Sequence, residues 1–323
     1  MTPHLSLLFL PAIALVTAVP DAGAQNYPDR PLRFVVPFAT GGTSDILARF
    51  LAPPLWNALG QSVVADNRPG AGSNLGNEIV ARAAPDGYTL LMATPALASN
   101  QALYGKLNYD PVTSFAPITL VAEIPIVLVV HPSMPTKSVR ELIALAKAQP
   151  GKLNFGSSGN GGIGHLVGEL FKSSTGVNMV HVPYKGNGPA LIDLMSGVLN
   201  LTFTDVAGGS PYIKAGKMRP LAITTPRRSA MLAEIPTMIE AGVPGFEATT
   251  WFAVFTTAGT PQPIVNRLNS EIVKILQAPD MRERLTSLGC DVVGNKPEEL
   301  AAFLKAEMAK WGKVVRDSGA RID

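Results

Sequence analysis

A glycine-bearing loop near the start of the chain, Phe38–Asp45, carries the residue types of an anion-binding site. It follows a strand-like apolar run and precedes a helix-like pattern. Free N–H groups at a helix start carry partial positive charge, so they can hold a carboxylate or phosphate without a basic side chain. Gly41 and Gly42 let the backbone approach a ligand closely. The alternative, from this stretch alone, is an ordinary turn capped by Ser44 or Asp45.

A second glycine-rich stretch, Phe155–Phe171, repeats this order of strand, loop and helix. Within it, Gly159–Gly164 matches G-x-G-x-x-G, a pattern that also occurs in dinucleotide-binding loops. Those loops need an acidic residue about 20 residues further on to bind the ribose. The strand-like run Met179–Lys185 holds no Asp or Glu, so the stretch is interpreted as another anion site, with Ser157, Ser158 and Asn160 as side-chain donors. Two such helix starts suit a cleft that closes around a small anion.

Residues that could support catalysis or metal binding are scattered. His131, His165 and His181 share no local motif with a nucleophile, which predicts core or surface histidines. No cysteines or histidines are paired at metal-ligand spacing, so neither a metal nor a cofactor is expected. Asp205 follows the strand-like run Leu201–Thr204, where its carboxylate could accept from a ligand amine or hydroxyl, or could cap the next helix.

Strand-like and helix-like stretches alternate along the chain, which is typical of parallel sheets covered by helices. At 323 residues with 46% hydrophobic content, the chain is long enough for two domains. The predicted strands are Leu32–Val36, Val63–Asp66, Thr89–Ala93, Ile118–Val121, Ile126–Val130, Leu153–Phe155, Met179–Val182, Leu201–Thr204, Leu221–Thr224, Thr250–Phe255 and Asp291–Val293.

Two features near the predicted site depart from this regular pattern. Pro53 and Pro54 fall inside the helix expected from Ser44 to Leu59, which predicts a kink or a break there. The stretches Asn67–Leu75 and Ala96–Pro111 have no clear element pattern, so they are predicted to be loops that could reach a ligand.

The first residues have the composition of an export signal. Leu5–Ala18 is apolar, without acidic or basic residues, and is too short to span a membrane comfortably. Ala22–Ala24 has the small-x-small form of a cleavage site, which predicts a signal peptide at 1–24, a mature chain from about Gln25 and a periplasmic location. The single cysteine, Cys290, excludes an internal disulfide and is expected to be buried and inert.

The charge of the chain is small. Removal of 1–24 removes one acid, Asp21, and moves the formal net charge from +3 to about +4. Because there is no basic run, neither nucleic-acid binding nor membrane insertion of the mature chain is expected.

Several short motifs along the mature chain are specific as a set. They are Tyr27–Pro31, the VPF-x-x-GG-x-x-D-x-x-AR segment that ends at Arg49, Asp66–Gly72, Pro85–Leu90, His181–Gly186, the segment at Trp251, and Gly259–Pro261. In this combination the chain resembles the Bug family of extracytoplasmic solute receptors, the substrate-binding proteins of tripartite tricarboxylate transporters.

This resemblance implies an α/β fold like that of a type II periplasmic binding protein, with two α/β lobes, a ligand cleft and a two-strand hinge. Lobe 1 would comprise 25–126 plus 250–323, and lobe 2 would comprise 127–249, with the hinge near Ile126–Val130 and Thr250–Phe255. The helix-start argument and the resemblance together predict these ligand-binding residues: Phe38, Thr40, Gly41, Gly42, Thr43, Ser44, Asp45, Thr94, Ser158, Gly159, Asn160 and Asp205.

The function implied is that of a periplasmic solute-binding protein rather than an enzyme. It would capture a small carboxylate, such as a di- or tricarboxylate, an amino acid or an aromatic acid, by lobe closure. It would then deliver the ligand to the membrane permease subunits of a tripartite tricarboxylate transporter. Two alternatives stay open: a secreted α/β hydrolase or transferase that uses Ser158 with a distant histidine, and a receptor that presents its ligand to a sensor protein.

Overall fold

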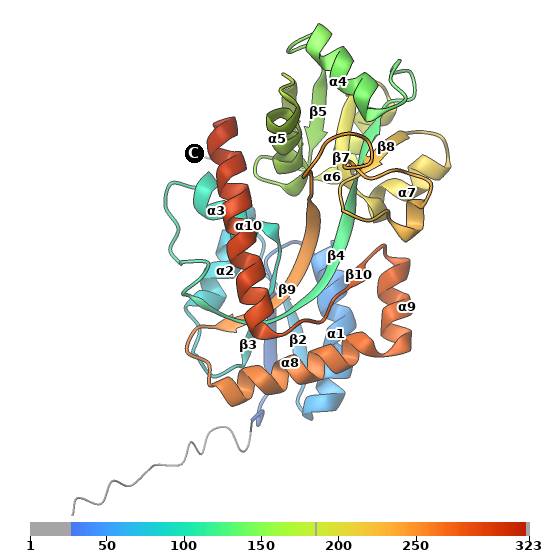
Figure 1. Ribbon diagram of the computed structural model, residues 1–323. Helices are drawn as coiled ribbons and strands as arrows, with labels where there is room; N and C mark the ends of the chain where they lie inside the picture. Colours follow the sequence, from blue (N-terminus) through green and yellow to red (C-terminus); the bar gives the residue numbers. More distant parts are fainter. Residues whose placement is uncertain (1–26, 185, 321–323) are drawn as a thin grey trace, which may run out of the picture.

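The computed structural model describes residues 27–184 and 186–320, which fold into two α/β lobes (Figure 1). The predicted signal peptide, with its cleavage point near Ala24, lies outside the described residues. Two long strands, β4 (Phe115–Val130) and β9 (Thr249–Thr257), run through the region where the lobes meet. This arrangement confirms the predicted two-lobe binding-protein fold.

The sheet of the first lobe is built around a parallel core. In it β1 (Leu32–Val36) lies between β2 (Val63–Asn67) and β3 (Thr89–Ala93) and is parallel to both. Next to β3, β9 runs antiparallel to it and to the first part of β4, and the short β10 (Asp291–Val292) also pairs with β4. Strand β1 is almost wholly apolar because helices cover both faces of a parallel sheet.

The sheet of the second lobe repeats this plan. Here β5 (Asn154–Ser157) lies between β6 (Val180–Pro183) and β7 (Leu201–Asp205) and is parallel to both. Strands β7 and β8 (Arg219–Ile223) are antiparallel to the second part of β4. Strand β4 therefore belongs to both sheets and joins them.

Helices cover these sheets and in several cases begin directly after a strand. In the first lobe they are α1 (Thr43–Leu59), α2 (Asn74–Ala81), α3 (Pro95–Leu103), α8 (Gln262–Gln277), α9 (Pro279–Ser287) and α10 (Pro297–Ser318), with a 3-10 turn η1 (Ala71–Ser73). In the second lobe they are α4 (Val139–Ala148), α5 (Ile163–Thr175), α6 (Asn187–Met195) and α7 (Val206–Lys214), with η2 (Ala230–Leu232).

The two strands predicted at Ile118–Val121 and Ile126–Val130 are one continuous strand, β4, so their separation was wrong. Glu123 and Pro125 interrupt the apolar pattern between them and gave the appearance of a boundary. In the structure Glu123 lies opposite Trp251 and Pro125 lies opposite Thr249, and the Thr249 hydroxyl donates to the Glu123 carboxylate at 2.8 Å. Pairing with β9 therefore carries β4 across both interruptions.

Of the kink or break predicted at Pro53 and Pro54, the break is wrong, because α1 continues through both prolines. Leu51, Ala52 and Leu55 around them are buried, whereas Pro53 is exposed and Pro54 is only partly buried. The missing N–H groups thus lie toward the solvent side of the helix, where water can hydrate the carbonyl groups that lose their partners.

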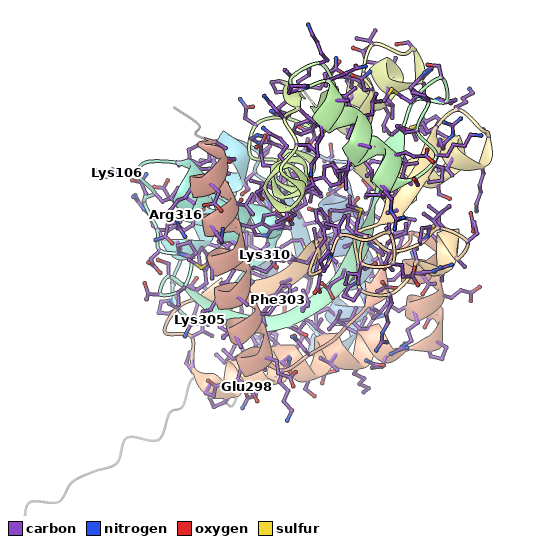
Figure 2. The ribbon with its side chains drawn as sticks, turned by 45° about the horizontal axis from the view of Figure 1, so that its top comes forward. Lys106, Glu298, Phe303, Lys305, Lys310 and Arg316 are labelled. Carbon is purple, nitrogen blue, oxygen red and sulfur yellow. The ribbon has the colours of Figure 1, made fainter. Side chains whose placement is uncertain are left out.

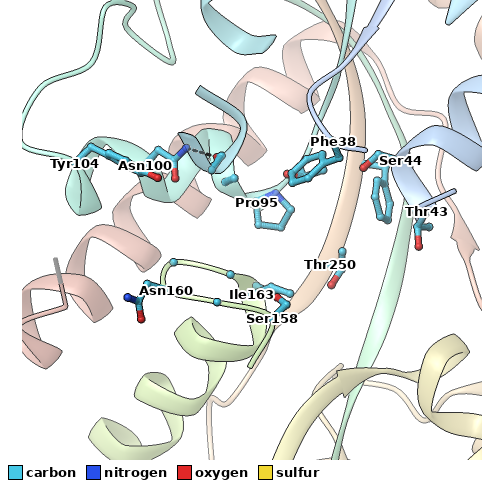
Figure 3. A pocket seen from close by; sticks show the side chains of 18 residues that line it. Phe38, Thr43, Ser44, Pro95, Asn100, Tyr104, Ser158, Asn160, Ile163 and Thr250 are labelled. Atoms are coloured by element: carbon cyan, nitrogen blue, oxygen red, sulfur yellow. Dashed lines mark hydrogen bonds between the residues drawn. The ribbon is translucent and has the colours of Figure 1, made fainter. Parts of the chain in front are cut away.

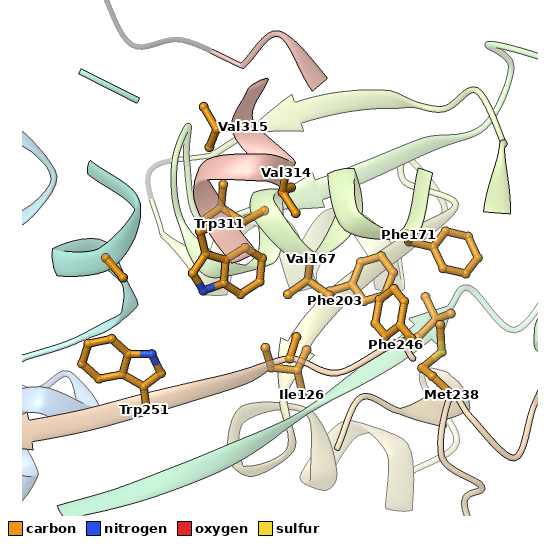
Figure 4. Packing of buried hydrophobic residues seen from close by; sticks show 14 of the residues in the cluster. Ile126, Val167, Phe171, Phe203, Met238, Phe246, Trp251, Trp311, Val314 and Val315 are labelled. Carbon is orange, nitrogen blue, oxygen red and sulfur yellow. The ribbon is translucent and has the colours of Figure 1, made fainter. Parts of the chain in front are cut away.

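The C-terminal helix α10 packs against both lobes, with α3 on one side and α5 on the other. Figure 2 shows it running from Glu298 to Arg316 across the molecule. Near its middle, the Glu307 carboxylate accepts hydrogen bonds at 2.8 Å from the indole N–H groups of Trp251 on β9 and Trp311 on α10 itself. Figure 4 shows both indoles within the apolar cluster that links the lobes, so α10 ties hinge strand β9 to the rest of the core.

Candidate functional site

A cavity of about 370 Å³ opens where the two lobes face each other (Figure 3). Residues from both lobes and from hinge strand β9 line it. They are Phe38, Gly42, Thr43, Ser44, Gly72, Thr94, Pro95, Ala96, Asn100, Tyr104, Ser158, Gly159, Asn160, Gly161, Gly162, Ile163, Thr250 and Phe252. None of these lining residues carries a charged side chain, so an anionic ligand would depend on backbone N–H groups and neutral polar groups.

The start of α1 supplies one wall of the cavity. Its N-cap is Gly42, and no side chain caps the first turn. Behind it, the Asp45 carboxylate accepts from the backbone N–H of Gly41 and from the Arg49 guanidinium, each at 2.9 Å. Burial alone would raise the pKa of Asp45, but these hydrogen bonds outweigh it and hold the pKa below the ordinary 3.8. Asp45 thus stays ionised and fixes the loop, while Gly42, Thr43 and Ser44 at the start of the helix line the cavity.

The start of α5 supplies the opposite wall. Its N-cap is Gly162, again without a side-chain cap. Under the loop, Ser157 Oγ lies 2.6 Å from His181 Nε2, and Gly161 N–H donates to His165 Nδ1 at 3.0 Å. The two imidazoles stack with ring centroids 3.9 Å apart. Burial lowers the pKa of His165 to about 4 and, together with the neighbouring imidazole, that of His181 to about 3, so both rings are neutral at pH 7.

A third helix, α3, also begins at the cavity. Its N-cap is Thr94, followed by Pro95 at the first helical position, and no side chain caps its first turn. Part of the stretch predicted as a loop at Ala96–Pro111 is therefore helical. The Thr94-Pro95 pair is a helix-start signal that could have revealed α3 from the sequence.

The structure brings most of the predicted site residues together and leaves others outside the cavity lining. Those on the lining are Phe38, Gly42, Thr43, Ser44, Thr94, Ser158, Gly159 and Asn160. Those off the lining are Thr40, Gly41, Asp45 and Asp205. Asp205 is the N-cap of α7, and its carboxylate accepts from the backbone N–H of Gly208 at 2.6 Å. Of the two roles considered for Asp205, a ligand contact and a helix cap, the structure shows the cap. The binding roles of these residues stay predictions.

Several lining residues were absent from the prediction. Thr250 and Phe252 belong to β9, which was expected to act only as a hinge, and Asn100 and Tyr104 lie on or just after α3. The buried histidine network was also missed, since Ser157, His165 and His181 come from three separate elements. The prediction of Ser157 as a ligand donor is wrong, because its side chain is buried against His181 and lies off the cavity lining. Only the pairing of β5 with β6 brings Ser157 near His181.

The geometry gives no support to a serine hydrolase at Ser158. Among the described residues, Ser158 makes no hydrogen bond to a histidine, and the serine beside His181 is Ser157, which is only 1% exposed. In the same part of the chain, no group of three or more potential metal ligands is found, and no helix is long and apolar enough to cross a membrane. The single cysteine, Cys290, is 2% exposed as expected, and burial raises its pKa to about 12.

Comparison with known proteins gives a consistent result. A family model described as the tripartite tricarboxylate transporter family receptor matches residues 47–320. Protein BugT of Bordetella pertussis is 37% identical over 312 residues, which cover 96% of each chain. A UPF0065 protein from the tcbD-tcbE intergenic region of Pseudomonas sp. (strain P51) is 38% identical over 310 residues, or 95% of this chain and 92% of the relative.

Solved structures agree with this result. An R. palustris protein with adipate is 41% identical, with a TM-score of 0.81 over 91% of this chain and 98% of that one. The periplasmic binding protein BugD is 35% identical, with a TM-score of 0.78 over 91% and 99% of the two chains. MatC from Rhodopseudomonas palustris with bound malate is 33% identical, with a TM-score of 0.78 over 90% and 100%. The family consists of receptors rather than enzymes. This chain belongs to the TctC family of tripartite tricarboxylate transporter receptors, as its motifs predicted.

Proposed function

We propose that this protein is a periplasmic receptor that captures a small organic carboxylate between its lobes. The observation that carries the proposal is the cavity around which, in the described residues, α1, α3 and α5 all begin without a side-chain cap. Uncapped N–H groups and the positive ends of helix dipoles favour an anion. The adipate and malate bound to the two related structures are both carboxylates.

The two lobes would close on the ligand by bending at the two hinge strands, β4 and β9. In this proposal, lobe 1 is 25–126 plus 250–323 and lobe 2 is 127–249. Bending of β4 and β9 brings the loop before α5 (158–162, the α5 loop) toward the loop before α1 (37–42, the α1 loop). A carboxylate prefers the closed form because both loops then donate to it, so the ligand shifts the population toward closure. Export through a signal peptide at 1–24 and delivery to membrane permease subunits complete the proposed role.

Calorimetry and thermal shift on the mature protein test this function. The panel contains straight-chain mono- and dicarboxylates of four to eight carbons, tricarboxylates and aromatic acids, each paired with its neutral methyl ester. We expect at least one acid to raise the melting temperature and to bind in calorimetry, and its ester to do neither, because only the acid is charged. Equal binding of acid and ester, or binding of no acid at all, would contradict a carboxylate receptor.

A further inference from the structure

The end of the cavity away from the α1 loop holds a separate polar group of residues. Figure 3 shows Asn100 and Tyr104 there, with Pro95 between them and the Phe38, Thr43 and Ser44 end. A ligand whose carboxylate lies at the α1 loop would direct its other end toward Asn100 and Tyr104. The chemistry of these two side chains therefore bears on which acid the cavity accepts.

The orientation of the Asn100 amide is fixed by its neighbours. Its Nδ2 group donates to the backbone carbonyl of Gly72 at 2.8 Å and to Asn74 Oδ1 at 2.7 Å. Since a backbone carbonyl can only accept, the nitrogen must face Gly72 and the oxygen must face the other way. Asn74 Oδ1 also accepts from the Tyr109 hydroxyl at 2.6 Å, so the network extends behind the cavity wall.

Asn100 Oδ1 is consequently an acceptor without a donor. Asn100 lines the cavity although it is only 2% exposed, and among the described residues nothing donates to its oxygen. The oxygen itself still reaches solvent, because it is not among the fully buried polar atoms that lack a partner, so a ligand that donates to it replaces water and keeps the acceptor paired when the cavity closes. Both Nδ2 hydrogens are already used, so the amide cannot turn to become a donor without losing them.

Tyr104 places a hydroxyl group at the same end of the cavity. Within the described residues its hydroxyl makes no hydrogen bond, and burial raises the pKa of Tyr104 above the ordinary 10.0, which keeps the phenol protonated. A Cβ on Gly72 would lie 2.6 Å from this hydroxyl, so glycine is what leaves room for it. The end of the cavity thus offers one free acceptor and one neutral group that can donate or accept.

We infer that this end of the cavity recognises a neutral group that donates a hydrogen bond, a primary amide or a hydroxyl, rather than a second carboxylate. The inference rests on the proposed function and narrows it to ω-amido or ω-hydroxy carboxylic acids. An amide N–H donates to Asn100 Oδ1 while its carbonyl accepts from the Tyr104 hydroxyl, so all these groups are satisfied. A carboxylate brings no proton, turns its charge toward Oδ1 and, among the described residues of the lining, finds no cationic side chain.

Isosteric ligands test the inference by calorimetry at pH 7.5. For each chain length from four to eight carbons, the half-amide, such as 6-amino-6-oxohexanoate, is compared with its dicarboxylate, such as adipate, and with the ω-hydroxy acid. We expect the half-amide or the hydroxy acid to bind at least about tenfold more tightly than the dicarboxylate at the preferred length. A dicarboxylate that binds as tightly as its half-amide or more tightly, for example through a bridging water, would overturn the inference and leave the proposed function standing. Absence of binding by every acid would reject both.

A variant locates the effect at this end of the cavity. Tyr104→Phe removes the hydroxyl and no described hydrogen bond, so it should fold like the parent chain, with Tyr212→Phe on α7, off the cavity lining, as the matched control. The preference for half-amide over dicarboxylate should fall below about threefold in Tyr104→Phe and persist in Tyr212→Phe. A full preference in Tyr104→Phe would overturn the assignment.

Discussion

The two glycine loops that face each other across the cavity are similar in sequence pattern but are supported by opposite chemistry. The α1 loop is held by a charged group, since Asp45 accepts from Gly41 N–H and from Arg49. The α5 loop is held by neutral groups, since Gly161 N–H donates to His165 and Ser157 contacts His181. A helix start can thus be positioned for an anion by a carboxylate behind it or by imidazoles beneath it.

The backbone also differs between the loops. Gly42 has φ −78°, an ordinary value, and an added Cβ would meet only Ala39 O at 3.7 Å. Gly162, the corresponding N-cap of α5, has φ −64°, but an added Cβ would lie 2.7 Å from Ser158 Oγ and 3.3 Å from Gly159 O. The N-cap of α1 can therefore accept a side chain without strain, whereas a side chain at the N-cap of α5 would displace Ser158. A charged side chain can therefore be introduced without strain at the start of α1 but not at the start of α5.

Gly42→Asp should have the largest effect on binding. The new carboxylate lies at the N-cap of α1, where it would repel the ligand and occupy the N–H groups that the ligand needs. We expect affinity for any bound acid to fall at least about 100-fold in calorimetry, with an unchanged or higher melting temperature because Asp is a favourable N-cap.

Gly42→Asn is the matched control, because it adds the same bulk without charge. Its loss of affinity should be clearly smaller than that of Gly42→Asp. Equal losses in the two variants would mean that the side chain acts by occupying the N–H groups rather than by its charge, and parent-like affinity in both would place the anion site elsewhere.

As pH falls, the buried histidines beneath the α5 loop should lower the stability of the folded protein before Asp45 behind the α1 loop does. The pKa values of His165 and His181, about 4 and about 3, lie below the ordinary 6.5, so the unfolded chain takes up protons first as pH falls. The free energy of unfolding should thus decrease between pH 6.5 and about 4, by up to about 1.4 kcal/mol per pH unit for each histidine. Asp45, with its pKa below 3.8, keeps its contribution over this range and loses it only at lower pH.

Urea unfolding of the parent chain and of His165→Gln at several pH values measures this difference. A glutamine can still accept from Gly161 N–H but does not titrate, so the pH dependence should be shallower in the variant. Identical slopes from pH 6.5 to 4 would show that His165 does not resist protonation in the folded protein.

The sequence predicted the parts of the site that are local. The α1 and α5 loops were identified because a strand, a glycine run and a helix pattern follow one another in the chain, and the structure places Gly42 and Gly159 on one cavity. The parts that were missed depend on pairing between distant segments. Ser157 meets His181 only because β5 pairs with β6, and Thr250 reaches the cavity only because β9 crosses between the lobes.

The fold shows the same limit. Period and composition predicted nearly every strand, but they divided β4 at Glu123 and Pro125, where cross-strand pairing with β9 overrides local preference. They also predicted a break in α1 at Pro53, where the exposed side of the helix tolerates the missing N–H. In both cases the tertiary surroundings of the residue, which cannot be read from the local sequence, determined whether the strand or helix continued.

Asp45→Ala should leave the α1 loop less ordered, because it removes the carboxylate that holds the loop. Asp45 is 4% exposed, and its removal leaves Gly41 N–H without its acceptor and Arg49 without its partner. Hydrogen bonds to charged groups contribute about 1.5–3 kcal/mol, so we expect roughly tenfold weaker ligand binding in calorimetry. Asp45→Asn retains an acceptor for Gly41 and should bind with intermediate affinity. A wild-type affinity in Asp45→Ala would mean that this carboxylate does not order the loop.

Arg49→Ala should have the smallest effect, although Arg49 is the basic side chain bonded to the loop-fixing Asp45. Its side chain is 51% exposed, and such ion pairs contribute only about 0.2–1 kcal/mol, so affinity should fall less than about fivefold and the loss should shrink in added salt. Lys172→Ala, which removes the ion pair to Glu169 on α5, is the counterpart in the other lobe and should be equally mild. A loss above about 20-fold in Arg49→Ala alone would mean that its charge acts on the ligand, and the α1 wall would then work through a cation rather than through backbone N–H groups.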